Sequence, residues 1–246
     1  DTDAFPLVSA KYLDLAHRLP LVVGYIDHPC IDIVVMEEMD YYGEIEGRVQ
    51  GWGWIFGKKG DSRHGNLIGV RKDSDWAIVD SQRIAFTNAE SVNRLFMHVT
   101  VEHKNTKQRV HILGTHLKAK KKNFQIRDSE SKQIGEYIKK LKTDSAAAII
   151  LCGDFNAEPA ESSIENIKAA GLTKMVKSDT VHTTAKYHSP EDHHIRQIDY
   201  IFYSADKLAP VETWQESTLP VPKNLFPSAD MPSDHLPIYG TFALIN

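Results

Sequence analysis

The chain reads Ala146-Ala147-Ala148-Ile149-Ile150-Leu151-Cys152-Gly153-Asp154-Phe155-Asn156-Ala157-Glu158-Pro159 in its second half. The apolar run 146–151 predicts a buried strand, and Glu161–Ala170, after the proline, predicts a helix. Asp154 and Asn156 therefore lie where a strand ends, and residues two apart on a strand share a face. A carboxylate can orient and deprotonate a water molecule, and a carboxamide can donate to a phosphoryl oxygen. The pair predicts hydrolysis of a phosphate ester.

Composition narrows the class of protein. The chain has 246 residues and a formal net charge of −4; we expect one domain, residues 1–246, without a linker. A negative net charge weighs against binding of long nucleic acid, although it permits a local basic cleft. No apolar run reaches the ~20 residues that span a bilayer. Cys30 and Cys152 lie on or beside predicted buried strands, so we expect reduced core residues and an intracellular protein, cytoplasmic or mitochondrial.

The pattern of apolar residues predicts a mixed α/β fold. Helices are expected over Leu7–Ile26 (broken at Pro20 and Gly24), Tyr42–Val49, Gln125–Leu141 and from Glu161. Strands are expected over Ile31–Met36, Gly51–Phe56, Leu67–Arg71, Trp76–Phe86, Leu95–Glu102, Arg109–Leu117, Ile198–Tyr203 and Pro237–Leu244. This order predicts a four-layer α/β/β/α sandwich, two sheets with outer helices.

Five polar clusters follow predicted strands, where chemistry is commonly mounted on a rigid scaffold. They are Glu38, Thr115-His116, Asp154 with Asn156, Asp199, and Ser233-Asp234-His235. Each has an ordinary alternative: Glu38 as a solvated helix start, His116 as a satisfied core histidine, Asp154 and Asn156 as an Asx turn. Asp199 could also join a surface ion pair, and Ser233-Asp234-His235 could cap a turn. Their joint occurrence at strand ends favours a catalytic centre.

The residue types fit metal-assisted phosphoester hydrolysis, in which a divalent cation neutralises the phosphate and the leaving oxygen. Hard oxygen ligands such as Glu38 and Asp234 suit Mg²⁺, with Mn²⁺ as the alternative. No Cys/His cluster has zinc spacing. His235 can contact the water or the phosphoryl oxygens, and Asp199 can hold His235 in one tautomer.

The same motifs resemble those of the endonuclease/exonuclease/phosphatase superfamily, whose members share a DNase-like sandwich. The resemblance rests on five segments that follow one another along nearly the whole chain: Asp32–Asp40, Thr115-His116-Leu117, Gly153-Asp154-Phe155-Asn156, Ile198-Asp199-Tyr200-Ile201 and Ser233-Asp234-His235. Within the superfamily the chain is most similar to the nocturnin-like enzymes. That likeness rests on Thr115-His116-Leu117-Lys118-Ala119-Lys120, followed by Arg127 and Glu130, and on Cys152–Pro159.

The resemblance implies a role for each matched residue. Glu38 would bind the metal, and Asp234 would complete the polar centre. Asp154 would activate water with Asn156 near the phosphate, His235 would contact the phosphate with support from Asp199, and His116 would face the phosphoryl group. Substrate contacts are implied for Lys58, Lys118, Lys120, Arg127 and Arg196, although Lys118–Lys122 also reads as a solvated lysine run.

Three activities stay open. Nocturnin-like enzymes convert NADP(H) to NAD(H) by removing the 2′-phosphate, so NADP(H) is the expected substrate. A 3′–5′ exonuclease acting on the 3′ end of poly(A) RNA is the alternative, because the catalytic set is shared. A binding module with impaired catalysis is the third reading, because the first family strand, with its Trp-Asn-like motif, is not found before Asp32. Glu37 also replaces the usual glutamine, and we expect it to face away from Glu38 with little effect. Arg196 is offset by one position from the family arginine.

Overall fold

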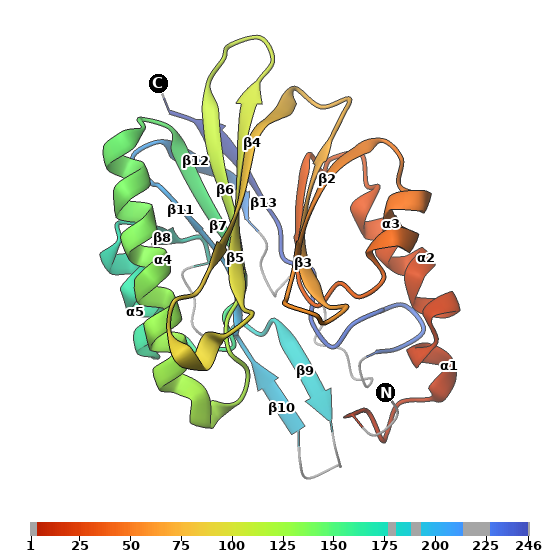
Figure 1. Ribbon diagram of the computed structural model, residues 1–246. Helices are drawn as coiled ribbons and strands as arrows, with labels where there is room; N and C mark the ends of the chain where they lie inside the picture. The colour runs from red at the N-terminus through yellow and green to blue at the C-terminus, as the bar shows by residue number, and fades with distance from the viewer. Residues whose placement is uncertain (1–3, 177–180, 188–192, 214–226, 246) are drawn as a thin grey trace.

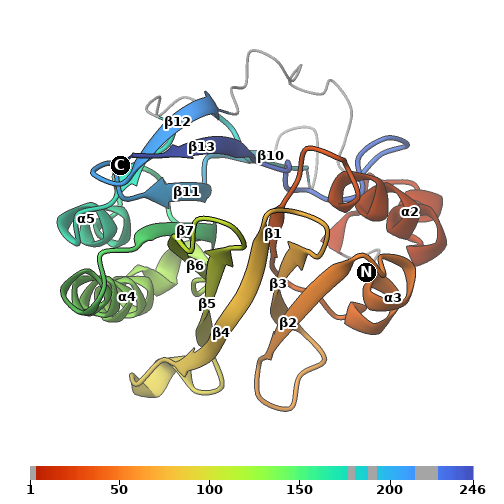
Figure 2. The ribbon, with the colours of Figure 1, turned by 90° about the horizontal axis from the view of Figure 1, so that it is seen from above.

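Two β-sheets pack face to face in a computed structural model that describes residues 4–176, 181–187, 193–213 and 227–245. The first sheet has the order β4-β5-β6-β7-β11-β8, and the second has the order β1-β3-β2. A separate pair, β12 and β13, and a hairpin, β9 and β10, complete the described strands. Helices α4 and α5 cover the outer face of the first sheet, and α2 and α3 cover the outer face of the second (Figures 1 and 2). The predicted four-layer sandwich is confirmed.

The bounds of the elements follow the predicted order closely. The helices are α1 Ala10–Leu13, α2 Leu15–Ile26, α3 Tyr42–Arg48, α4 Phe124–Asp144 and α5 Ser162–Ala169, with short 3₁₀ turns at Ala89–Ser91 and Lys121–Asn123. The strands are β1 Ile33–Met36, β2 Trp52–Lys58, β3 Gly65–Arg71, β4 Trp76–Ala85, β5 Leu95–His103, β6 Arg109–His116, β7 Ala148–Asp154, β8 Thr173–Lys174, β9 Thr184–Tyr187, β10 His193–Arg196, β11 Asp199–Tyr203, β12 Leu208–Thr213 and β13 Gly240–Leu244.

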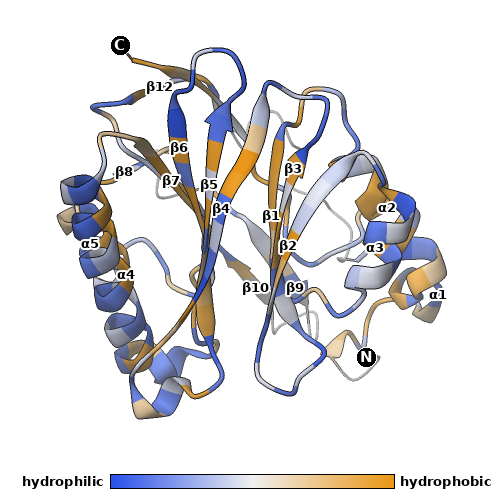
Figure 3. Cartoon of the chain, turned by 45° about the horizontal axis from the view of Figure 1, so that its top comes forward, coloured by the Kyte–Doolittle hydropathy of each residue, from blue (hydrophilic) through white to orange (hydrophobic). Residues whose placement is uncertain are grey.

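Three hydrophobic cores correspond to the three interfaces between the four layers. One lies between the first sheet and helices α4 and α5, and includes Phe155 and Ile164. A second lies between the two sheets and includes Ile68 and Met97. The third lies under α2 and α3 and includes Leu19. Because apolar residues alternate with polar ones along the outer helices (Figure 3), each helix buries one stripe and leaves the other in water.

The structure corrects two predictions about local elements. Helix α2 runs through Pro20 and Gly24, and the break comes earlier, where Asp14 caps α2 by accepting from the amide of Ala16. A proline inside a helix removes one backbone hydrogen bond, which packing of Leu19 and Ile26 can offset. Both cysteines are free, as expected, but Cys30 is exposed rather than part of the core.

None of the helices among the described residues has the length and apolar character needed to cross a membrane.

Candidate active site

Three polar residues form a row across neighbouring strands at one end of the first sheet. His116 ends β6, Asp154 ends β7 beside it, and Asp199 begins β11 on the other side. His116 pairs with Asp154 in the parallel register, and Asp199 pairs with Asp154 in the antiparallel register. Strand alternation puts all three on the face that meets the second sheet, because Cys152 and Ile201 pack in the core between the sheets. The topology thus brings together three of the predicted site residues.

Gly153 permits the close pairing of β6 and β7 next to this row. It adopts φ 146°, and an added Cβ would lie 1.9 Å from the carbonyl oxygen of Thr115. Any side chain there would push β7 away from β6, and Asp154 would move with it.

An Asx turn fixes the carboxylate of Asp154. The backbone amide of Asn156 donates to Asp154 Oδ1 at 2.7 Å, and Asn156 Nδ2 donates to Oδ2 at 3.1 Å and to the carbonyl oxygen of Leu117 at 3.1 Å. Asn156 has a left-handed backbone with φ 50° and lies beyond β7, so strand periodicity does not align the pair as expected. The Asx turn and the candidate site are therefore not alternatives. The hydrogen bonds of the turn hold the Asp154 carboxylate in the position that it occupies in the site.

His235 is held by the carboxylate of Asp199 on β11, which in turn accepts from the hydroxyl of Thr183, the residue before β9. Its Nδ1 lies 3.0 Å from both oxygens of Asp199, and the Thr183 hydroxyl donates to Asp199 Oδ2 at 2.6 Å. Burial opposes protonation of His235, but the charge and hydrogen bond of Asp199, together with the charges of Asp154 and Asp234, outweigh it and raise the pKa to about 10. At neutral pH the ring is an imidazolium whose Nε2–H is free to donate to a bound anion.

His116 is the neutral counterpart of His235. Lys59 Nζ lies 2.9 Å from His116 Nδ1 and, as an ammonium, must donate to it. The proton of the ring is then on Nε2, which faces Asp154 Oδ2 at 3.6 Å. Burial, together with the charges of Lys59 and Arg94, lowers the pKa of His116 well below its usual value. Arg94 also donates to the carbonyl oxygen of His116 at 2.5 Å.

The carboxylates of Asp154, Asp199 and Glu37 lie close together at this centre. Burial, and then the charge of Asp199, raise the pKa of Asp154 above its ordinary value. Burial, and then Asp199 and Asp154, raise the pKa of Glu37 to about 8. Glu37 Oε1 is buried with no hydrogen-bond partner. A buried carboxylate oxygen without a partner is unfavourable, and among the carboxylates of this centre Glu37 Oε1 is in that situation.

A divalent cation fits the donor set. Asp154, Asp199 and His235 each bring an oxygen or nitrogen atom, and these atoms all lie within 4.8 Å of one another. As an imidazolium His235 cannot bind a metal ion, so in this group the two carboxylates are the donors. The neighbouring Glu37 oxygen is another hard donor without a partner. Oxygen donors of this kind suit Mg²⁺ or Mn²⁺ better than zinc.

Two neighbours of predicted site residues also lie at this centre. Glu38 is exposed, with φ 55°, and its charge acts on Asp154 and Lys59, whereas Glu37 Oε1 is buried and the Glu37 carboxylate feels the charges of Asp199 and Asp154. Lys58 is likewise exposed, and Lys59 is the lysine in contact with His116. Strand alternation in the sequence could have placed Glu37 at this centre. Ile33 and Val35 face the core between the sheets, and Glu37 continues their alternation.

Other predicted residues lie around the centre rather than in it. Arg127 is buried and pairs with Glu161 through two hydrogen bonds of 2.6 and 2.7 Å. Its guanidinium is therefore not exposed for the substrate contact that the resemblance implied. It also donates to the carbonyl oxygens of Lys118 and Lys120, and it thereby holds their loop next to His116. Lys120 is exposed and Lys118 is half-buried.

The loop before β13 and strand β10 supply the remaining two predicted residues. The carboxylate of Asp234 lies 4.0 Å from Lys186, outside the metal-sized cluster, while its carbonyl oxygen accepts from Ala185. Arg196 ends β10, and its Nε is buried without a hydrogen-bond partner. Strand β10 pairs with β9, whose Thr184 forms a bridge with His235, so Arg196 approaches the same end of the sandwich.

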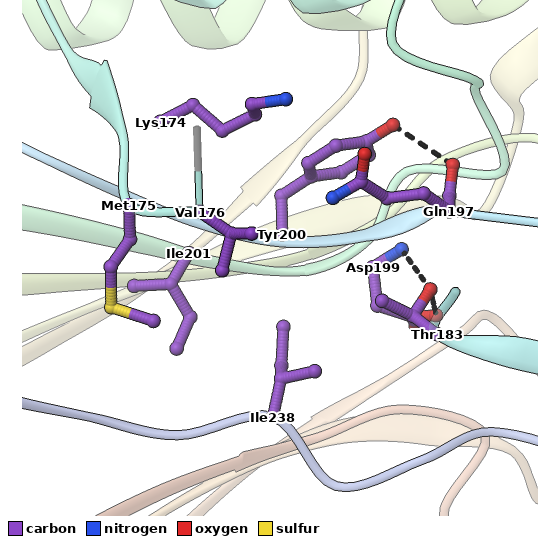
Figure 4. Close-up of a pocket in the computed structure, with 9 residues that line it drawn as sticks. All are labelled: Lys174, Met175, Val176, Thr183, Gln197, Asp199, Tyr200, Ile201 and Ile238. Atoms are coloured by element: carbon purple, nitrogen blue, oxygen red, sulfur yellow. Dashed lines mark hydrogen bonds between the residues drawn. The ribbon is translucent and has the colours of Figure 1, made fainter. Parts of the chain in front are cut away.

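A cavity of about 10 Å³ lies beneath Asp199, between β11 and the residues around it (Figure 4). It is lined by Asp199, Thr183 and Gln197 together with apolar side chains such as Ile201 and Ile238. Such a volume holds about one water molecule. The cavity is too small for a substrate.

Comparisons with known proteins agree with this geometry. The profile described as Endonuclease/Exonuclease/phosphatase family matches residues 10–235. Nocturnin of Drosophila melanogaster is 24% identical over 297 residues, covering 99% of this chain and 44% of the relative. Nocturnin of Homo sapiens is 26% identical over 240 residues, covering 86% of this chain and 54% of the relative. The chain thus spans about half the length of the curated relatives it matches.

Solved structures share the fold. The human nocturnin catalytic domain with bound sulfate anion has a TM-score of 0.77 at 22% identity, covering 95% of this chain and 88% of that chain. ANGEL2, described as a 2′,3′-cyclic phosphatase in complex with adenosine-2′,3′-vanadate, has a TM-score of 0.81 at 18% identity, covering 98% and 90%. The predicted resemblance is confirmed. The chain belongs to the endonuclease/exonuclease/phosphatase family.

Proposed function

We propose that this chain is a Mg²⁺-dependent phosphoester hydrolase, with Mn²⁺ as the alternative ion, and that it removes the 2′-phosphate of NADP(H). The observation that carries the hydrolytic part is the row His116, Asp154 and Asp199, with His235 joined to Asp199 at 3.0 Å. Within this row a neutral and a cationic histidine flank two carboxylates, as general acid–base chemistry requires.

Asp154 and Asp199 would hold the ion, with His235 at the edge of the same cluster. When bound, a divalent cation neutralises the charge of the phosphate and of the leaving oxygen. Its presence would also lower the unfavourable energy of three buried carboxylates close together.

Asp154 is the candidate base for the attacking water. Its carboxylate is held by the Asn156 hydrogen bonds, and its raised pKa brings it closer to neutral pH, where a general base works best. The imidazolium of His235 can donate to a phosphoryl oxygen, and Lys59 adds a positive charge beside His116. These groups stabilise the charge that develops in the transition state.

A compact nucleotide substrate is supported by three features. The Lys118–Lys120 loop is fixed by Arg127 next to His116, and Arg196 offers a guanidinium nitrogen without a partner. The chain is acidic overall, with a net charge of −4, so its positive groups are local. The similarity to nocturnins in sequence supports the same assignment.

The second candidate is a 3′–5′ exonuclease acting on poly(A), supported by the exposed lysines of the 118–122 run. One assay separates the two. Purified protein with Mg²⁺ is given NADP⁺, adenosine 2′,3′-cyclic phosphate or a labelled oligo(A), and phosphate release and chain length are followed. We expect phosphate from NADP⁺ and intact oligo(A). Shortening of oligo(A) without release of phosphate from NADP⁺ would reverse the assignment.

A further inference from the structure

The short backbone segment from His116 to Lys118 is joined to the active centre at Leu117. The amide of Leu117 donates to the carbonyl oxygen of Asp154 at 2.9 Å, and the carbonyl oxygen of Leu117 accepts from Asn156 Nδ2 at 3.1 Å. These two hydrogen bonds connect the segment to Asp154 and to the asparagine that holds its carboxylate. The position of His116 relative to Asp154 therefore depends on how firmly this segment is fixed.

An ion pair fixes the two outer ends of the same segment. Arg94 Nη2 donates to the carbonyl oxygen of His116 at 2.5 Å, and the amide of Lys118 donates to Glu130 Oε2 at 2.8 Å. Arg94 Nε donates to Glu130 Oε1 at 2.7 Å, and the hydroxyl of Ser91 donates to the same oxygen at 2.5 Å. Every backbone polar group from the carbonyl of His116 to the amide of Lys118 thus has a partner.

This pair is buried beside the centre. Arg94 stands directly before β5, and Glu130 lies on α4. The side chain of Glu130 is fully buried, and that of Arg94 is 14% exposed. Burial, and then the charge of Arg94, lower the pKa of Lys59, which contacts His116. Loss of one partner of such a pair leaves the other charge buried and uncompensated.

We propose that Arg94 and Glu130 are positioning residues of the active site, which act by fixing the backbone on both sides of Leu117. This rests on the proposed function, in which His116 and Asp154 belong to one catalytic row. Neither Arg94 nor Glu130 needs to touch the substrate in this role. Without the pair, the segment would depend on the two hydrogen bonds of Leu117 alone, and a displacement of about 1 Å can cost an enzyme about 100-fold in rate.

Hydrogen exchange of backbone amides tests the geometry without a substrate. Glu130→Gln keeps the shape of the side chain and removes the charge that pairs with Arg94. We expect at least about tenfold faster exchange at Lys118 and also at Leu117. Ile138→Val, which removes one buried methyl group from α4, is the control for lost stability and should change both amides less.

Faster exchange at Lys118 alone would overturn the inference, because Glu130 would then hold only its own hydrogen bond. Equal acceleration in Ile138→Val would also overturn it, because lost stability would explain the effect. Should Glu130→Gln not fold, Ser91→Ala removes a single hydrogen bond to Glu130. It should change the same two amides in the same direction, and wild-type exchange at Leu117 in a folded Ser91→Ala protein would count against the proposal.

Steady-state hydrolysis of NADP⁺ with Mg²⁺ tests the functional part. In Glu130→Gln we expect kcat to fall at least about tenfold, with a smaller change in KM because Arg127 still holds the carbonyl oxygens of the lysine loop. Ile138→Val should keep the wild-type kcat. Arg94→Ala combined with Glu130→Gln should be no slower than the slower single variant, because the two side chains act as one unit.

A wild-type kcat in Glu130→Gln, or effects of the two substitutions that add, would overturn the inference. Absence of hydrolysis by the wild type would overturn the proposed function instead. The exchange experiment would then still decide whether the pair fixes the segment beside Asp154.

Discussion

At the scale of single residues, the charge of His235 depends on the carboxylates around it, with Asp199 first among them. Asp199 holds the ring through Nδ1 at 3.0 Å, and it counteracts the effect of burial, which alone lowers the pKa of a histidine. The sandwich thus provides a cation next to Asp154, because Asp199 begins β11 directly opposite Asp154 and binds the ring of His235.

We predict that Asp199→Asn lowers the pKa of His235 from about 10, because the variant loses both the charge and the carboxylate hydrogen bond of Asp199, while Asp154 and Asp234 still raise it. NMR titration of the ring in metal-free protein measures this. The wild-type ring should stay protonated through pH 8, and the variant ring should lose its proton at a lower pH than the wild-type ring. A variant that titrates like the wild type would show that Asp199 is not the source of the charge.

The predictability of the site from sequence also differs residue by residue. Asp154, Asn156, Asp199 and His235 could be found because each belongs to a short polar motif at a strand end. Glu37 and Lys59, which also lie at the centre, were not among the predicted site residues, although counting by two along each strand points to them. Motif matching fixes a segment to within one residue, and on a strand one residue is the difference between facing the site and facing away.

At the scale of elements, the loop after β6 is held by a buried ion pair. Arg127 on α4 contacts Glu161 at the start of α5 and donates to two carbonyl oxygens of the lysine loop. The side chain of Arg127 is 1% exposed, and that of Glu161 is 21% exposed. One arginine thereby ties two helices to the loop beside His116.

Replacement of Arg127 by alanine should lower the free energy of unfolding by about 3–5 kcal/mol, because the Glu161 carboxylate and two carbonyls lose their partner. Urea denaturation measures this. Lys139→Ala, which breaks an exposed pair with Glu136, is the control and should change stability by about 0–1 kcal/mol. Equal small losses in both variants would contradict the structural role given to Arg127.

Elements with clear periodicity could be predicted from sequence, and short irregular ones could not. Strands β9 and β10 consist of Thr184–Tyr187 and His193–Arg196, which carry few apolar residues and give no alternation signal. They pair with each other. The start of β9 also contacts the loop before β13: the carbonyl oxygen of Thr183 accepts from the amide of Leu236, and Thr184 forms a bridge with His235. Their structure comes from tertiary contacts rather than from their own composition.

At the scale of the whole molecule, a network of buried histidines joins the first sheet to α4. Tyr137 on α4 donates to Gln82 and so must accept from His98 Nδ1 at 2.8 Å. His98 Nε2 is then the acceptor for His111 Nδ1 at 2.9 Å. Burial, and then the neighbouring His111, lower the pKa of His98 to about 4. A proton on Nε2 would disrupt this arrangement.

The folded protein therefore resists protonation of His98, and stability should fall with pH. The unfolded chain takes up the proton near pH 6.5 and the folded chain only near 4, so stability is full above pH 6.5 and decreases down to about pH 4. The decrease from this residue is at most about 3 kcal/mol. Unfolding curves of the wild type and His98→Gln from pH 8 to 4 measure it; parallel curves would exclude His98 as the source.

The four-layer architecture could be predicted because long strands and the amphipathic helix 124–144 each require a covered apolar face. The arrangement of strand ends follows from the order β6-β7-β11, in which a parallel pair meets an antiparallel one. That topology, rather than any single motif, puts His116, Asp154 and Asp199 in one row.

The central claim is that this row is the centre of a metal-dependent phosphoester hydrolase. Phosphate release from NADP⁺ with Mg²⁺, with and without EDTA, tests it for the wild type, Asp154→Asn and the exposed control Glu136→Gln. We predict release that EDTA abolishes, a loss of at least about 100-fold in Asp154→Asn, and wild-type rates in the control. Hydrolysis that survives both EDTA and Asp154→Asn would contradict the account.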